Sequence, residues 1–218
     1  MMKYMQAILL VLYFISCDQP GHKEVKQESL PYYITADFTP HWMEVDKELP
    51  GSIHHISGFS FVDQNGRSFT EKTIAGKIYV ADFFFTSCQG ICPKLTKNLC
   101  LVQAAFKEDT AVVLLSHSVT PGKDDTAVLK RYARNNGVLD NKWFLLTGNK
   151  DSIYTIARKS YFADEAVGEQ LGVDDFLHTE NVFLIDAKRR IRGIYKGTLP
   201  SEIQSLIRDI RILKQENK

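Results

Sequence analysis

An apolar run that stops at two cysteines constrains this chain more than any other feature. Residues 78–85 are apolar apart from Asp82, which is typical of a buried strand. A short polar loop with Cys88 follows, and then Cys92 and Pro93. Proline suits the first position of a helix, because its missing N–H is not needed there. The pattern predicts a strand, a loop that carries Cys88, and a helix that begins near Cys92.

This placement predicts reactive thiols. The amide dipoles of a helix N-terminus favour negative charge, so we expect at least one of the two thiols to ionise more easily than a free cysteine. A strand that leads to a dithiol at a helix start is typical of thioredoxin-like proteins. Three residues separate Cys88 from Cys92, however, where an ordinary redox motif has two. The wider spacing favours metal binding over simple redox chemistry.

The rest of the folded part alternates between strand and helix patterns. This order predicts an α/β fold, a thioredoxin-like mixed sheet flanked by helices, with an N-terminal hairpin. The predicted elements are a hairpin over 59–62 and 67–69, strands over 77–85, 111–116 and 143–146, helices over 93–106, 124–136 and 152–160, an antiparallel pair over 182–186 and 191–195, and a last helix that ends near residue 213.

The N-terminal part predicts export. Residues 1–17 combine Lys3 with an apolar stretch that is too short to span a bilayer and that ends at Cys17, which resembles a bacterial lipoprotein cleavage box. We expect a lipoprotein-type signal peptide over 1–17 with Cys17 lipidated, a tether and extended aromatic segment over 18–50, and the domain over 51–218. The protein would then lie in the bacterial cell envelope, anchored by lipid to a membrane and facing the periplasm. A plain secretory signal or a short N-terminal anchor is the alternative.

Composition excludes some classes. The chain is 44% hydrophobic with a net charge of +1, so no nucleic-acid partner is expected. Its four cysteines are too few for a disulfide scaffold. Cys100 follows Cys92 by eight residues, about 12 Å along a helix, and is therefore expected in the core. Removal of the signal leaves Met43 as the one methionine, which excludes a thioether-rich copper site.

The two thiolates suit Cu(I) or Zn(II), and both metals need a third ligand. His178 lies in a polar loop before a late apolar strand, where a thioredoxin plan can bring it beside the dithiol. A histidine on a surface loop has the same sequence pattern. His117, after the second parallel strand, is the reserve candidate. The remaining histidines carry weaker signals, two being adjacent and two lying in the tether, namely His54, His55, His22 and His41.

Three segments resemble the Sco/SenC family. They are residues 76–93 around Cys-x3-Cys-Pro, residues 118–126 with the helix pattern of 128–133, and residues 178–186, which begin with His178-Thr179. The resemblance covers roughly residues 50 to 215. It implies a thioredoxin-like fold and one copper ion, as Cu(I) or Cu(II), held by Cys88, Cys92 and His178. It also implies a role in assembling the binuclear copper centre of cytochrome c oxidase, with the copper-bearing subunit and an upstream copper donor as partners.

This chain departs from the family pattern at two positions. Thr120 stands where the family commonly has aspartate, with an extra residue in the loop that follows, and Leu177 stands where it commonly has aspartate before the histidine. Neither position is a metal ligand in the motif. Copper binding should therefore survive, but any tuning of the metal by those two carboxylates is in doubt.

Two function classes stay open from the sequence. One is a non-enzymatic copper chaperone. The other is a thiol–disulfide oxidoreductase that keeps the cysteines of an acceptor reduced, with Cys88 or Cys92 as the attacking thiol. The three-residue spacing and His178 favour the metal. A structural disulfide between the two cysteines, and zinc in place of copper, are further alternatives.

Overall fold

The computed structural model describes residues 29–42, 53–163 and 179–216. Within these ranges the helices are the 3-10 helix η1 Glu71–Ile74, α1 Cys92–Ala105, α2 Thr126–Asn135, α3 Lys150–Lys159 and α4 Pro200–Glu216. The strands are β1 Tyr32–Tyr33, β2 Pro40–His41, β3 Ser60–Val62, β4 Ser68–Thr70, β5 Ile78–Phe84, β6 Val112–Ser118, β7 Trp143–Leu146, β8 Asn181–Ile185 and β9 Ile191–Lys196.

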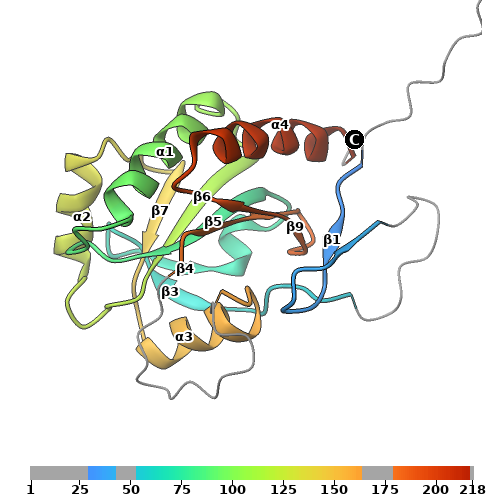
Figure 1. The fold of residues 1–218 in the computed structure, drawn as a ribbon. Coiled ribbons are helices and arrows are strands. Elements are labelled where there is room, and N and C mark those ends of the chain that lie inside the picture. Colours follow the sequence, from blue (N-terminus) through green and yellow to red (C-terminus); the bar gives the residue numbers. More distant parts are fainter. Residues whose placement is uncertain (1–28, 43–52, 164–178, 217–218) are drawn as a thin grey trace, which may run out of the picture.

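Seven strands form one mixed sheet in the order β2-β1-β9-β8-β5-β6-β7, with helices on both faces (Figure 1). β5, β6 and β7 are parallel, and β8 and β9 join antiparallel beside β5. Every residue of β5 and β6 is buried, as central strands covered on both faces require. β3 and β4 form the predicted hairpin as a separate two-stranded sheet. The predicted thioredoxin-like architecture is confirmed.

Two helix starts differ from the sequence prediction by two residues. Asp125 caps α2 by accepting a hydrogen bond from the Val128 N–H, so Asp124 lies outside the helix. Asn149 caps α3 by accepting from the Ser152 N–H, so α3 begins before the predicted residue. A cap has an extended backbone although its side chain serves the helix, and this is why sequence patterns place helix ends imprecisely.

The sheet separates two hydrophobic cores. One lies between the sheet and the helices α1, α2 and α4, and it includes Leu95, Leu129 and Leu206. The other lies under α3 and the β3–β4 hairpin, and it includes Phe61, Phe69 and Ile153. The chain therefore has a core on each face of the sheet, and the dithiol loop joins a central strand to a helix on the first face.

Helices α1 and α4 lie side by side and run in the same direction (Figure 1). In the middle of α1, the Asn98 amide donates to the Gly197 carbonyl just before α4, at 2.8 Å. Near the C-terminal ends of the two helices, Lys214 of α4 pairs with Asp109, and Arg211 stacks over the Phe106 ring. The 14 residues of α1 span about 20 Å. We call the end with the start of α1 the cysteine pole, and the end with the last turn of α4 the clasp pole.

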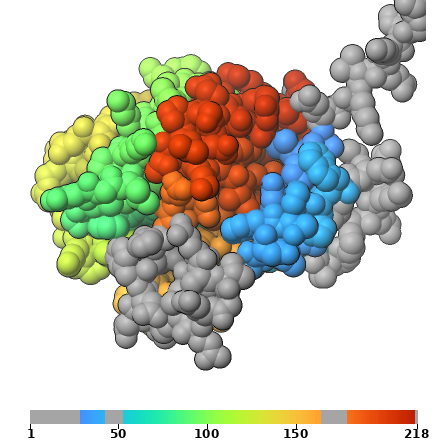
Figure 2. Space-filling view, in the orientation of Figure 1, coloured from blue at the N-terminus to red at the C-terminus, as the bar shows by residue number. Residues whose placement is uncertain are grey.

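The described chain enters the domain at the clasp pole. Residues 29–42, which we call the strap, add β1 to the edge of the sheet beside β9 (Figure 2, blue). Buried Arg192 of β9 donates to the carbonyls of Leu30 and Pro31 at 2.7 and 3.0 Å, and it pairs with Glu216 at 2.7 Å. The Glu216 carboxylate also accepts from the Leu30 N–H at 2.7 Å. These bonds tie the strap to the end of α4.

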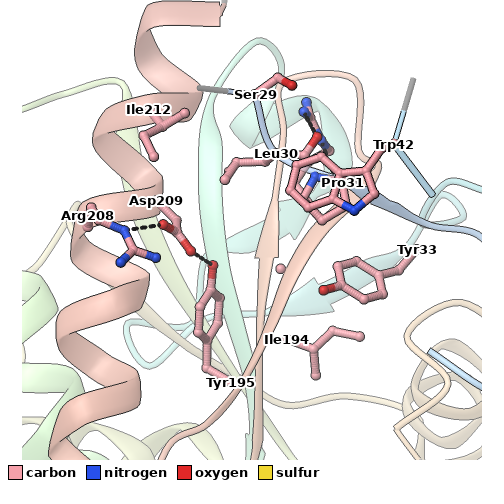
Figure 3. Close-up of a pocket in the computed structure, with 12 residues that line it drawn as sticks. Ser29, Leu30, Pro31, Tyr33, Trp42, Ile194, Tyr195, Arg208, Asp209 and Ile212 are labelled. Carbon is pink, nitrogen blue, oxygen red and sulfur yellow. Dashed lines mark hydrogen bonds and ion pairs between the residues drawn. The ribbon is translucent and has the colours of Figure 1, made fainter. Parts of the chain in front are cut away.

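A cavity of about 680 Å³ lies between the strap and α4. Figure 3 shows Trp42 and Tyr33 of the strap on one side and Asp209 of α4 on the other, with the Tyr195 hydroxyl donating to Asp209 at 2.8 Å. Arg208, on the exposed side of α4, donates to the second oxygen of Asp209 at 2.9 Å. The cavity lies along the strap and is separate from the cysteines.

Several predicted features fall outside the described residues. These are the signal peptide with Cys17, residues 18–28 and 43–50 of the tether with His22, and Leu177 and His178, which come directly before the described residue Thr179. In the three described ranges, no helix has both the length and the apolar character needed to cross a membrane.

Candidate metal-binding dithiol

Cys88 and Cys92 lie where β5 gives way to α1, as the sequence predicts. β5 ends at Phe84 and α1 begins at Cys92, with Pro93 in its first turn. Both thiols are free; Cys88 is half-buried in the loop and Cys92 is 4% exposed. The pair therefore offers one accessible sulfur and one sulfur that faces the core.

The two thiols differ in acidity. Burial of Cys88 opposes ionisation, but hydrogen bonds from the backbone and side chain of Cys92 and from the Gly90 and Ile91 backbone outweigh it and lower the pKa of Cys88. Burial raises the pKa of Cys92 to about 12, and the neighbouring Cys88 and the charge of Asp82 add to the rise. The expectation of one easily ionised thiol is met by Cys88 in the loop, although Cys92 begins the helix.

Asp82 lies behind the dithiol inside β5. Its carboxylate accepts from the Ser116 hydroxyl at 2.5 Å, and that hydroxyl accepts from the Trp143 indole N–H at 2.8 Å. Burial raises the pKa of Asp82 to about 7, although the bond from Ser116 opposes the rise. Asp82 is not among the site residues predicted from the sequence. The available signal was a single carboxylate inside an otherwise apolar strand, because such a group is retained only with partners.

The start of β8 lies against the first turns of α1. The Glu180 carbonyl accepts from the Gly197 N–H at 2.8 Å, and a Cβ placed on Gly197 would lie 2.1 Å from a methyl of Leu95. A hydrogen bond from Thr198 lowers the pKa of Glu180, and the charges of Lys196 and of Lys94 in α1 act in the same direction. The segment that follows His178 therefore runs beside the helix that begins at Cys92.

His117, the reserve ligand, is a core residue, so that prediction is wrong. Its ring is fully buried, 5.2 Å from the Phe83 ring and 5.5 Å from the Phe61 ring, centroid to centroid. Neither ring nitrogen has a hydrogen-bond partner among the described residues. Burial lowers the pKa of His117 to about 3, which keeps it neutral. It pairs with Phe83 across the strands and belongs to the core on the α3 face.

The other candidates also have structural roles or lie apart. His54 contacts the Ser160 carbonyl oxygen through Nε2 at 2.7 Å and packs against the Phe162 ring in a tilted arrangement. Cys100 packs partly buried against the core, as expected, and its thiol donates to the Asn136 carbonyl at 3.5 Å. Among the described residues no group of three or more histidine, cysteine or acidic side chains could hold a metal ion.

The described part of the site therefore supplies two sulfur donors. Adjacent thiols that become thiolates are soft ligands, and they fit Cu(I) or Zn(II) better than a hard cation such as Mg²⁺. The half-buried position of Cys88 leaves the pair open on one side. A third donor has to come from outside the described residues or from a partner.

Comparison with known proteins identifies the family. The SCO1/SenC family model matches residues 48–214. A SCO1/SenC family lipoprotein from Bacillus anthracis is 29% identical, with a TM-score of 0.64 over 74% of this chain and 95% of that one. BsSco, described as a member of the Sco family of cytochrome c oxidase assembly proteins with a disulfide switch, is 27% identical, with a TM-score of 0.62 over 75% and 94%.

A structure with copper bound is also similar. Arabidopsis thaliana ScoI is 25% identical, with a TM-score of 0.55 over 71% of this chain and 97% of that one. The match of the family model covers most of the chain and includes the strand, the dithiol loop and helix α1. This chain belongs to the SCO1/SenC family.

Proposed function

We propose that this protein is a membrane-tethered copper metallochaperone that delivers copper to the binuclear copper site of cytochrome c oxidase. Cys88, Cys92 and His178 would hold the copper, which is the cargo of the protein. The observation that carries the proposal is the pair of free thiols at the open start of α1, with the start of β8 alongside. The copper-bound and oxidase-assembly relatives support the same function.

The chain neighbours of His178 support its assignment as the third ligand. Thr179 is buried and its hydroxyl accepts from the Asn181 N–H at 3.0 Å, which anchors the start of β8. Glu180 lies near Lys94 in the first turn of α1, and the charge of Lys94 helps to lower the pKa of Glu180. One residue of extended chain spans about 3.5 Å, and residue 178 directly precedes a segment that packs against α1.

Three ligands on an open edge suit a carrier. A closed four-ligand site holds its metal permanently, whereas an open position lets a ligand of the acceptor enter before a ligand of the carrier leaves. Loading also displaces protons, because the Cys92 thiol, whose pKa is raised to about 12, has to lose its proton to bind. Cys88 gives up its proton more readily and is the first sulfur to engage the metal.

The tether would set where this exchange happens. Lipidation at Cys17 would hold the domain to a membrane of the bacterial cell envelope, on the periplasmic side, through a tether that leads to the strap at Ser29. The lipoprotein description of the Bacillus anthracis relative supports this arrangement. Mass spectrometry of the protein isolated from membranes should find a diacylglyceryl group on Cys17, and an unmodified or uncleaved Cys17 would contradict it.

Copper binding tests the ligand set. The purified chain should bind one Cu(I), and changing Cys88 or Cys92 to serine should abolish tight binding. His178→Ala should weaken Cu(I) binding by at least about tenfold in a competition titration with a chromophoric chelator, while the circular dichroism spectrum stays the same. His55→Ala, at an exposed position, is the matched control and should bind like the unchanged protein. Equal affinity in the His178→Ala variant would show that the third ligand is wrong.

A second function rests on the contrast between the thiols. An accessible Cys88 with a lowered pKa next to a buried Cys92 with a raised pKa is the arrangement of an attacking and a resolving thiol. The metal-free protein would then act as a thiol–disulfide oxidoreductase that reduces the acceptor. Rapid turnover of a model disulfide, unchanged in the His178→Ala variant, would favour this function over copper delivery.

A further inference from the structure

Asp124 is a buried carboxylate next to the dithiol loop. It lies between β6 and α2 and is 1% exposed. Its oxygens accept four hydrogen bonds, from the Thr86 N–H at 3.1 Å, the Thr86 hydroxyl at 2.5 Å, the Ser118 hydroxyl at 2.6 Å and the Thr120 hydroxyl at 3.0 Å. A carboxylate that accepts this many bonds holds its partners firmly, because each is a charge-assisted bond in a buried setting.

These bonds connect the dithiol loop to a neighbouring strand. Thr86 precedes Cys88 by two residues, and both its backbone and its side chain are bound to Asp124. The Cys88 N–H in turn donates to the Phe85 carbonyl at 3.3 Å, which closes the turn around Thr86. The backbone that carries the Cys88 sulfur is therefore fixed on one side by β5 and on the other by Asp124.

Helix capping does not account for Asp124. The cap of α2 is Asp125, whose side chain accepts from the Val128 N–H at 2.8 Å. The adjacent Asp124 side chain points the other way, to Thr86 and Ser118. Two neighbouring aspartates thus serve different elements, and this gives a matched pair of positions for an experiment.

Thr120 is the third residue that donates a hydrogen bond to Asp124. Its hydroxyl binds Asp124, and its N–H donates to the Ser118 hydroxyl at 3.2 Å. An aspartate at position 120 would place a second acceptor against the Asp124 carboxylate, with no proton between them. The threonine in this chain therefore fits a site where the carboxylate comes from residue 124.

We propose that Asp124 is a positioning residue, which holds Thr86 and thereby fixes the approach of the Cys88 sulfur to Cys92. It keeps both cysteines as the free thiols that the structure shows and so resists the closer approach that an S–S bond of about 2.05 Å requires. The copper part of this inference rests on the proposed function. The redox part does not, because it concerns the two thiols alone.

The redox measurement is an equilibrium with a small dithiol. Oxidised dithiothreitol accepts two electrons and two protons from the Cys88 and Cys92 thiols, which form one disulfide, while the reagent becomes a dithiol. Mass spectrometry after thiol alkylation gives the ratio of the two protein forms in the full chain. Asp124→Asn should shift the equilibrium constant about tenfold towards the disulfide, which corresponds to about 30 mV for a two-electron couple.

Variants at both ends of the contact make the test specific. Thr86→Val removes the hydroxyl from the other partner and should shift the equilibrium in the same direction, whereas Thr86→Ser keeps the hydroxyl and should restore it. Asp125→Asn changes the cap of α2 at the adjacent position and leaves the bonds to Thr86 in place. It should therefore leave the dithiol–disulfide equilibrium constant within about twofold of that of the unchanged protein. Thermal melting would show that each variant is folded.

Two results would overturn the proposal. One is an equilibrium constant within about twofold of the unchanged protein in both Asp124→Asn and Thr86→Val. The other is an equal shift in Asp125→Asn, which would mean that general loosening is responsible. Cu(I) titration of the same variants should show weaker binding for Asp124→Asn. If the unchanged protein does not bind copper, the proposed function fails while the redox measurement still decides the role of Asp124.

Discussion

The cysteine pole and the clasp pole hold their chain segments by different means. At the clasp pole, buried Arg192 joins the strap to β9 and α4 through two carbonyls and Glu216, and it stacks on Tyr32 with 4.1 Å between the guanidinium carbon and the ring centroid. At the cysteine pole, Asp124 holds a loop whose sulfur side stays half-open. One pole is closed by buried charge pairs, and the other keeps one reactive group accessible.

The difference indicates that the contacts that stabilise the fold and the reactive thiols lie at opposite ends of the domain. The two poles lie about one length of α1 apart, so the strap holds the point of entry without covering the dithiol. Under the proposed function, a tether that enters at the clasp pole would leave the cysteine pole free to meet an acceptor. At this separation, we expect a change at one pole to leave the other unaffected.

The largest expected effect is at the clasp pole. Arg192→Met removes a buried cation and leaves Glu216 and Asp186 without it, so the free energy of unfolding should fall by about 3–5 kcal/mol in urea denaturation. Arg208→Met, at an exposed arginine of α4, should cost under about 1 kcal/mol. Cu(I) affinity of the folded Arg192→Met protein should stay within about threefold. A loss of affinity comparable to the loss of stability would show that the poles are coupled.

The next effect concerns the stability in acid of the core on the α3 face, which contains His117. The pKa of His117 is lowered to about 3 in the folded chain from an ordinary 6.5, so the unfolded chain takes up its proton first as the pH falls. The contribution of neutral His117 is complete above pH 6.5 and is lost as the pH falls towards 3, by about 2 kcal/mol between pH 7 and pH 5. His117→Leu should remove that part of the pH dependence in urea unfolding.

The control for this prediction is His55→Leu, because His55 is exposed. Its stability should vary with pH as in the unchanged protein. A His117→Leu variant that still lost the same stability between pH 7 and pH 5 would mean that other groups cause the acid sensitivity.

A smaller effect tests the asymmetry inside the cysteine pole. In the metal-free, reduced protein at pH 7, iodoacetamide should modify Cys88 at least about tenfold faster than Cys92, because the thiolate is the nucleophile and the pKa of Cys88 is lowered while that of Cys92 is raised. Peptide mass mapping over time gives both rates. Faster labelling of Cys92 would reverse the proposed roles of the two sulfurs.

The smallest effect is expected for an exposed ion pair beside the start of β8. Lys196→Ala removes an exposed ion pair with Glu180 at 3.3 Å, and such pairs contribute under about 1 kcal/mol to unfolding. Cysteine reactivity should not change measurably. A loss of several kcal/mol would indicate that the start of β8 depends on this pair more than its exposure implies.

The sequence predicted the dithiol correctly because that signal is local. An apolar run, a polar break and a proline are enough to place Cys88 in a loop and Cys92 at a helix start, since each depends on a few neighbouring residues. The prediction for His117 was wrong because it, too, depended on the local sequence alone. β6 is buried on both faces, so its residues do not alternate between apolar and polar, and the sequence does not say which face His117 occupies.

Long-range contacts account for what the sequence left out. Asp124 binds Thr86 across 38 positions, and Arg192 binds Leu30 across 162. The order of acidity of the two cysteines also depends on burial, because the helix start alone favours Cys92 whereas the packed structure leaves Cys88 the more acidic. No pattern within one element of the chain carries these contacts.

The sequence by itself determined the order of strands and helices, the dithiol loop and the family resemblance, because periodicity, turn residues and caps act over a few positions. The tertiary structure alone decided which polar side chains meet. In the folded chain, His117 lies among aromatic rings, Asp124 binds Thr86 of the cysteine loop, and Arg192 binds the Leu30 carbonyl of the strap. Those outcomes follow from burial, since a buried polar group has to take the partners that the packed chain brings to it.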